Sequence, residues 1–169
     1  MTEEALRELM DEQGHYLLKV AFYYCKNWGY AEEIVQDVFV KFYKKNEQFK
    51  EQSSIRTYLT KMTINQSKDY LKSWRYKKHL IFGESVDQVI SDPITKVFHE
   101  KIRQNEVLDS VFRLKAPYRE VLIYYYFEEK SIAEIALLLN ENERTIRTRL
   151  QRARNKLKLH KDLIDLEGM

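Results

Sequence analysis

Apolar residues recur at helical spacing along most of the chain. One stripe consists of Leu17, Leu18, Ala21, Phe22 and Cys25. Further stripes are formed by Ile34, Val35, Val38, Phe39 and Phe42, by Ile55, Leu59, Met62 and Ile64, and by Val107, Leu108, Val111, Phe112 and Leu114. Each follows the i, i+3/i+4, i+7 spacing of one helix face and not the alternation of a strand. Only four glycines and two prolines occur in 169 residues, which also favours helices. The pattern predicts an all-α protein.

Interruptions of this pattern divide the chain. Short breaks fall at Asn27–Tyr30 and Asn46–Ser54. A longer one covers roughly residues 80–95 and contains Gly83, Ser85, Asp87, Ser91, Asp92 and Pro93. Because this composition is poor in strong helix formers, we interpret it as a linker between two small helical domains.

Charge is distributed unevenly, although the net charge is only +3. Residues 1–15 carry five acidic side chains and a single Arg7. Residues 144–161 carry eight Lys or Arg and no acid. A cationic excess confined to one segment indicates a polyanionic partner, and a nucleic acid before a membrane.

Two short helices with a tight polar turn are expected inside this C-terminal part. Ser131 and Glu134 have the spacing of a capping box at the start of a helix reaching Leu139. Residues 140–143 then form a polar turn, with Asn140 and Asn142 as candidate caps. A second helix is predicted from about Glu143. This arrangement is a helix-turn-helix.

The second helix divides into two faces when its residues are placed at 100° intervals. The stripe predicted to face the core contains Ile146, Leu150, Ala153 and Leu157. The candidate DNA-binding residues are Arg144, Thr145, Arg147, Thr148, Arg149, Arg152 and Arg154. Thr and Arg side chains on the exposed face could reach base edges, and flanking arginines suit phosphates. A solvated basic helix is the alternative, but the capping box, turn and preceding helix together favour DNA reading.

The motifs resemble those of the extracytoplasmic-function (ECF) sigma factors of bacterial RNA polymerase. Residues 131–136 and 145–154 resemble the helix-turn-helix of that family's region 4. Residues 31–41 resemble region 2.2, and residues 54–71 resemble regions 2.3 and 2.4. The resemblance covers nearly the whole chain in the family's order. Asn142 and Arg144 stand where members often carry Pro and Gly, and Tyr58 stands where a Trp is usual.

The resemblance implies a division of labour between two helical domains. Residues 1–80 would form region 2, which binds polymerase and opens the promoter −10 element. Residues 81–98 would be a linker, and residues 99–169 would form region 4, which reads the −35 element. Core RNA polymerase and promoter DNA are the implied partners, together with an anti-sigma factor as inhibitor.

The segment around residues 56–78 interleaves cations with aromatic side chains, which suits the capture of phosphates and unstacked bases. We predict −10 contacts from Tyr58, Lys61, Asn65, Lys68, Lys72, Trp74 and Arg75. Asn65 stands where the family places a residue near the flipped base. Core packing is the alternative for the aromatic residues, most strongly for Tyr70 and also for Tyr58. For Asn65 the alternative is a helix cap.

The resemblance also assigns a polymerase-binding surface to the region 2.2 helix. The predicted contacts are Glu32, Glu33, Gln36, Asp37 and Lys41. The periodicity by itself is equally typical of an ordinary solvated face of an amphipathic helix.

Catalytic and metal sites are not expected. The four histidines have no metal-ligand spacing with acids or with Cys25, and no Gly-rich phosphate loop or Gly-x-Ser-x-Gly motif occurs. We therefore predict a protein that is not an enzyme and uses no cofactor or small-molecule substrate. A cytoplasmic location is predicted separately, from the single Cys25, the acidic N-terminus without an apolar core of signal-peptide length, and the short longest apolar run, Val121 to Phe127. Two alternatives remain: a stand-alone helix-turn-helix regulator with an N-terminal sensor or dimerisation domain, and an adaptor that binds other proteins through its helices.

Overall fold

The computed structural model describes residues 1–73, 76–78 and 93–167, and these contain helices and no strands. The chain forms two compact units, Met1–Lys96 and Val97–Met169. The predicted all-α, two-domain architecture is confirmed. Most of the predicted linker lies outside the described residues. Its last part is helical, because α5 spans Pro93–Gln104. Within the described residues, no helix has the length and apolar character needed to cross a membrane.

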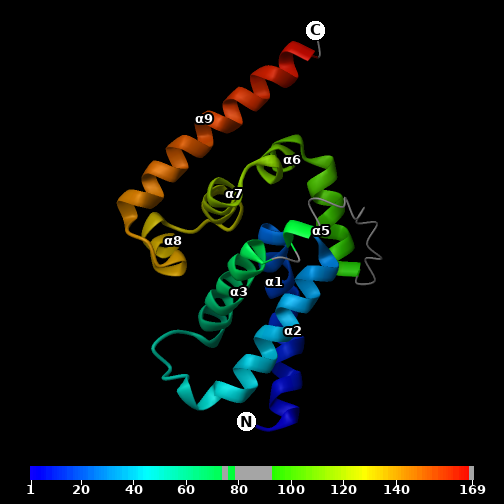
Figure 1. Ribbon diagram of the computed structural model, residues 1–169, viewed down its shortest axis with the longest axis vertical. Coiled ribbons are helices and arrows are strands. Elements are labelled where there is room, and N and C mark those ends of the chain that lie inside the picture. The colour runs from blue at the N-terminus through cyan, green and yellow to red at the C-terminus, as the bar shows by residue number, and fades with distance from the viewer. Residues whose placement is uncertain (74–75, 79–92, 168–169) are drawn as a thin grey trace. The chain divides into compact units, whose positions relative to one another are not determined.

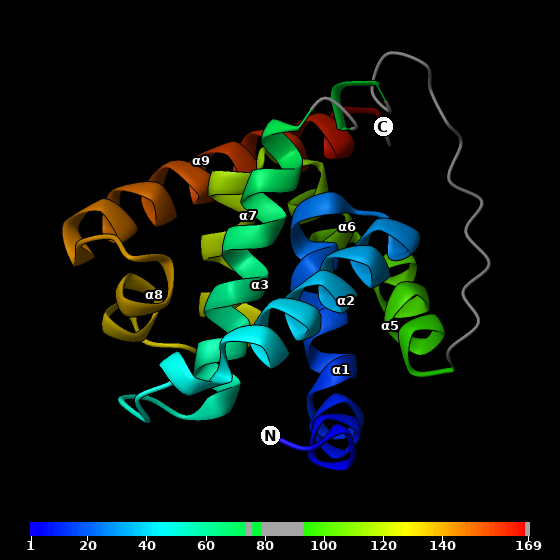
Figure 2. The same cartoon turned by 60° about the horizontal axis from the view of Figure 1, so that its bottom comes forward.

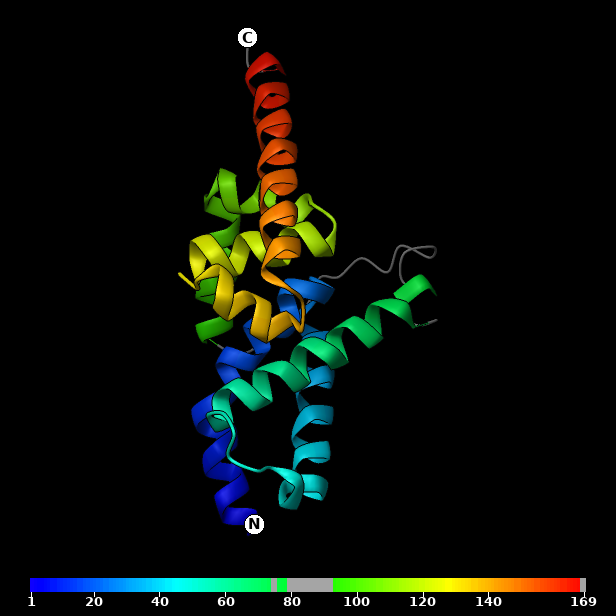
Figure 3. The ribbon, with the colours of Figure 1, turned by 90° about the vertical axis from the view of Figure 1, so that its left-hand side faces the viewer.

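The N-terminal unit is built from three long helices, α1 (Glu3–Cys25), α2 (Trp28–Lys45) and α3 (Ile55–Lys72). Each of them packs against the other two (Figures 1 and 3). The short 3-10 helix η1 (Asn46–Gln48) leads from α2 towards the turn before α3. Asn27 and Ser54 cap α2 and α3 through their side chains. The breaks predicted from the sequence are therefore real, although the first is narrower than expected, since α2 begins at Trp28.

Much of the core of this unit comes from the predicted stripes, although Val20 and Tyr24 join it and Ile55 and Met62 are only half-buried. Leu17, Phe42 and Leu59 are almost completely buried and represent the three helices. Phe22 stacks on Trp28 with ring centroids 4.0 Å apart, which holds the end of α1 against the start of α2. This packing fixes the outward faces of α2 and α3.

The C-terminal unit contains α6 (Glu106–Arg113), α7 (Ala116–Leu122), the π-helical turn η2 (Ile123–Phe127), α8 (Ile132–Leu139) and α9 (Glu143–Glu167). α9 contacts α6, α7 and α8 and extends as one long helix (Figures 1 and 2). The buried Arg119 donates to the carbonyl oxygen of Leu114 at 2.9 Å, which ties α7 to the end of α6. Val107 departs from the predicted core stripe, because its side chain is exposed.

Candidate nucleic-acid interface

The helix-turn-helix begins with the predicted capping box. The Ser131 hydroxyl accepts from the Glu134 amide at 3.1 Å, and the Glu134 carboxylate accepts from the Ser131 amide at 3.2 Å. Asn140 ends α8 in the left-handed conformation, which asparagine tolerates better than most residues. The Asn142 side chain accepts from the Thr145 amide at 2.8 Å and so caps α9. Both predicted asparagine caps are confirmed, and the second helix begins at Glu143 as expected.

The capping box also affects the charge of Glu134. Hydrogen bonds from the Ser131 amide, and then from its hydroxyl, lower the pKa of the Glu134 carboxyl, and nearby Lys130 adds to this effect. Glu134 is therefore ionised at neutral pH at the start of α8, where a negative charge interacts favourably with the helix dipole.

α9 has a buried stripe and an opposite polar face, as its sequence predicts. Ile146, Leu150 and Ala153 are essentially inaccessible, whereas Leu157 is half-buried. The exposed face carries Arg144, Arg147, Thr148, Gln151, Arg152 and Asn155. Asn155 is absent from the predicted set, although its helical angle places it between Thr148 and Gln151. Thr145 is half-buried and occupied in the cap, since its hydroxyl donates to Asn142.

Three arginines of α9 have partners within the unit. Arg147 is exposed and pairs with Glu143 at 3.0 Å. Arg154 donates from Nε to the Tyr126 hydroxyl at 2.6 Å. Arg149 is half-buried and lies 3.0 Å from a carboxylate oxygen of Glu141. The sequence predicted Arg149 as a DNA contact. Its position beside Glu141 was missed because a residue eight positions earlier lies beyond simple helical spacing.

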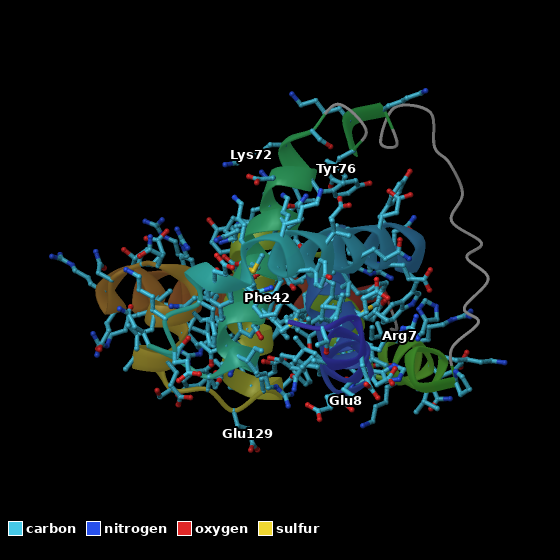
Figure 4. The ribbon with its side chains drawn as sticks, turned by 90° about the horizontal axis from the view of Figure 1, so that it is seen from below. Arg7, Glu8, Phe42, Lys72, Tyr76 and Glu129 are labelled. Carbon is cyan, nitrogen blue, oxygen red and sulfur yellow. The ribbon has the colours of Figure 1, made fainter. Side chains whose placement is uncertain are left out.

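Helix α3 carries most of the residues predicted to contact the −10 element, with different degrees of exposure. Asn65 is exposed in the middle of α3, and Lys72 is exposed near its end. Figure 4 shows Lys72, the last residue of α3, well apart from Phe42 of α2. Because Ser54 caps this helix, the alternative reading of Asn65 as a cap is wrong. Lys61 and Lys68 are half-buried, and the Lys68 ammonium lies 6.0 Å from the centre of the Tyr24 ring.

Tyr58 is half-buried at the start of α3, next to two other aromatic rings. Its ring centroid lies 5.0 Å from that of Phe49 and 6.1 Å from that of Phe42. These contacts place Tyr58 in the aromatic cluster at the start of α3, in agreement with the core-packing alternative. Trp74 and Arg75 lie outside the described residues.

The outer surface of α2 contains all five residues predicted to contact polymerase. Glu32, Glu33, Gln36, Asp37 and Lys41 are exposed. The Lys41 ammonium donates to the side-chain oxygen of Gln66 in α3, so it is partly occupied within the unit. The sequence interpretation missed Val40 and Tyr43, which are 51% and 39% exposed on the same helix. The signal was present, because Val40 follows Glu33 and Gln36 by seven and four residues and shares their face.

Comparison with known proteins identifies the family. Sigma-70 region 2 matches residues 9–76, and Sigma-70, region 4 matches residues 104–157. The ECF RNA polymerase sigma factor SigW of Bacillus subtilis is 24% identical over 174 residues, covering 97% of this chain and 91% of SigW. This chain is an ECF sigma factor. It therefore belongs to the factors that direct promoter-specific initiation by RNA polymerase.

Other similar proteins agree with this assignment. The probable RNA polymerase sigma factor RfaY of Xanthomonas campestris is 28% identical over 130 residues, which make up 73% of this sigma factor and only 32% of RfaY. This chain thus spans about a third of the length of RfaY. The sigma factor RpoE from Bartonella quintana, solved in complex with the anti-sigma factor NepR, has a TM-score of 0.67 at 20% identity. That match covers 92% of this chain and 95% of RpoE, and it shows the shared fold.

Proposed function

We propose that this sigma factor divides promoter recognition between its two units, with α9 reading the −35 element and α3 opening the −10 element. The observation that carries the proposal is the polar face of α9. It lies opposite the buried Ile146, Leu150 and Ala153, at the end of a fully capped helix-turn-helix. Such a helix can enter a major groove with its hydrophobic stripe still covered by its own unit.

Base reading is assigned to the centre of the exposed face of α9. Arg144, Thr148 and Asn155 lie there, with Gln151 and Arg152 to either side. Arginine can bind guanine with two hydrogen bonds, and amide side chains can do the same with adenine. Arg147 and Arg154 lie towards one edge, where phosphates are the nearest groups in such a docking geometry. A guanidinium has five N–H donors, so the bond from Arg154 to Tyr126 leaves others for a phosphate.

Promoter opening is assigned to α3. An extruded base exposes its Watson–Crick edge, and the exposed amide of Asn65 offers a donor and an acceptor to such an edge. Lys61, Lys68 and Lys72 supply positive charge along the same helix for the DNA backbone. Trp74 and Arg75 follow in the sequence and remain proposed contacts.

Polymerase binding is assigned to the outer face of α2, through Glu32, Glu33, Gln36 and Asp37, with Lys41 at its margin. Val40 adds an apolar side chain at the centre of this polar face. Interfaces are commonly built in this way, with a small apolar centre surrounded by polar groups.

The cellular setting follows from this role. We place the protein in the cytoplasm with core RNA polymerase, as a non-enzymatic initiation factor without a cofactor or small-molecule substrate. Its domains are proposed as residues 1–80 and 99–169, joined by residues 81–98. RpoE was solved with the anti-sigma factor NepR, and CnrH with the cytosolic domain of CnrY. An inhibitory protein of this kind is a proposed partner of this chain.

Run-off transcription tests the proposal directly. The pure chain is added to core polymerase on a library of genomic fragments, and the transcripts are sequenced. We expect transcripts from a small set of fragments that share two spaced elements, and none with core polymerase alone. Specific binding of duplex by the chain alone, with no effect on transcription, would instead support a stand-alone regulator.

A further inference from the structure

Arg149 lies between two carboxylates from different parts of the C-terminal unit. Its Nη2 is 3.0 Å from Oε1 of Glu141, in the turn before α9, and its Nη1 is 4.0 Å from Oε1 of Glu120 in α7. The first contact is a hydrogen-bonded ion pair, and the second is a longer electrostatic contact. The exposed fraction of the side chain is 26% for Arg149 and 3% for Glu120.

The direction of Arg149 differs from that of the proposed base-reading residues. At 100° per residue, Arg149 lies about 120° around α9 from Asn155 and about 60° from Arg152, on the side next to the buried stripe. The planar guanidinium suits simultaneous contacts with two carboxylates. Because the site is half-buried, salt screens these contacts less than it screens exposed pairs.

We propose that Arg149 is a positioning residue that fixes the orientation of α9, and that it does not itself contact DNA. This inference rests on the proposed reading of the −35 element by α9. Ile146 and Leu150 anchor α9 along one buried stripe. A tie at the flank of that stripe opposes rotation. A polar side chain makes a productive contact only when it lies within about 0.5 Å and 10–20° of the ideal geometry. A small rotation of α9 therefore weakens all of its base contacts at once.

The two possible roles of Arg149 predict opposite effects of the substitution Glu141→Gln on DNA binding. If Arg149 positions α9, Glu141→Gln loosens the tie and lowers the ratio of specific to non-specific affinity. If Arg149 is a direct DNA contact held back by Glu141, Glu141→Gln frees a cation and removes an anion, so binding to all sequences strengthens. Glu143→Gln is the matched control, since it removes the same charge nearby but only from the exposed partner of Arg147.

The experiment measures binding of the holoenzyme to a promoter fragment that run-off transcription has identified. A duplex of scrambled sequence competes for binding, and the ratio of the two affinities is the specificity ratio. The variants are Arg149→Met, Glu141→Gln, their double variant, Glu143→Gln and Arg152→Ala. We expect Arg149→Met to lower the specificity ratio by about three- to tenfold, within the range of coupled side-chain networks. Glu141→Gln should give a smaller loss, the double variant no more loss than Arg149→Met, and Glu143→Gln none.

Stability is separated from positioning by working well below the melting temperature of each variant. A merely stabilising contact would lower the melting temperature and the active fraction but leave the specificity ratio unchanged. Equal effects of Glu141→Gln and Glu143→Gln, or full additivity in the double variant, would overturn the inference. If Arg152→Ala also leaves the ratio unchanged, the proposed reading by α9 fails with it. If Arg152→Ala lowers the specificity ratio but Arg149 and Glu141 show no coupling, only the positioning role is refuted and the reading of DNA by α9 stands.

Discussion

Replacing Asn65 by Ala separates promoter opening from fold stability. Asn65 is exposed within α3, and Ser54 provides the N-terminal cap of that helix. Alanine is the better helix former by about 0.5 kcal/mol, so Asn65→Ala should leave the folded state unchanged or slightly stabilised. For a unit of this size, that corresponds to a rise in melting temperature of at most about 2–4 °C.

The same substitution should impair opening. A two-bond contact with a base edge contributes about 1–3 kcal/mol, and extrusion of a base costs a few kcal/mol that captured contacts must offset. Loss of the Asn65 amide should therefore reduce the open complex about five- to 150-fold. Binding to core polymerase and to the −35 element should be unchanged, because the three surfaces lie on different helices.

The assay follows permanganate reactivity of unpaired thymines on the promoter and compares duplex with pre-melted templates. On a pre-melted template, Asn65→Ala should lose preference at one −10 base. Lys72→Ala provides the contrast, since it should weaken salt-dependent binding to every sequence without changing base preference. A lowered melting temperature together with unaltered preference at every −10 base would show that Asn65 is structural.

Further predictions concern the other surfaces and the core. Arg152→Ala should relax base preference at one −35 position by about 1–3 kcal/mol. Arg154→Ala should instead weaken binding to all sequences and reduce the slope of log affinity against log salt concentration by about one. Competition binding at several salt concentrations measures both. Phe42→Ala should destabilise the N-terminal unit by about 3–5 kcal/mol in thermal melting, because this ring is almost fully buried and contacts the rings of Phe49 and Tyr58. A cost below about 1 kcal/mol would contradict that packing. Because the pKa of Glu134 is lowered in the folded state, its contribution is complete above the ordinary carboxyl pKa and is lost as the pH falls through the lowered value. Glu134→Gln should therefore melt with less pH dependence as the pH falls below the ordinary carboxyl pKa. A profile identical to that of the unchanged protein would refute this.

Helices and their ends were predictable because local chemistry determines them. The Ser131 box, the Asn140 turn and the Asn142 cap each use side chains within a few residues of the backbone groups they satisfy. The buried stripes were predictable for a similar reason, since helical spacing alone brings Ile146, Leu150 and Ala153 to one face. Such features depend on the order of residues and very little on the tertiary fold.

Site residues were less predictable wherever tertiary contacts decide what an exposed-looking side chain does. By spacing, Arg149 and Arg152 are both arginines off the core stripe, and the sequence interpretation gave both to DNA. Spacing could not predict the contact of Arg149 with Glu120, because Glu120 is distant in sequence and only the packing of α7 on α9 brings it within 4.0 Å. Tyr58 illustrates the same limit, since its partner Phe42 comes from another helix. The acidic partners of a cationic helix should therefore be located before its DNA contacts are assigned. A cation that is paired within its own unit can orient a DNA-reading surface without being part of that surface.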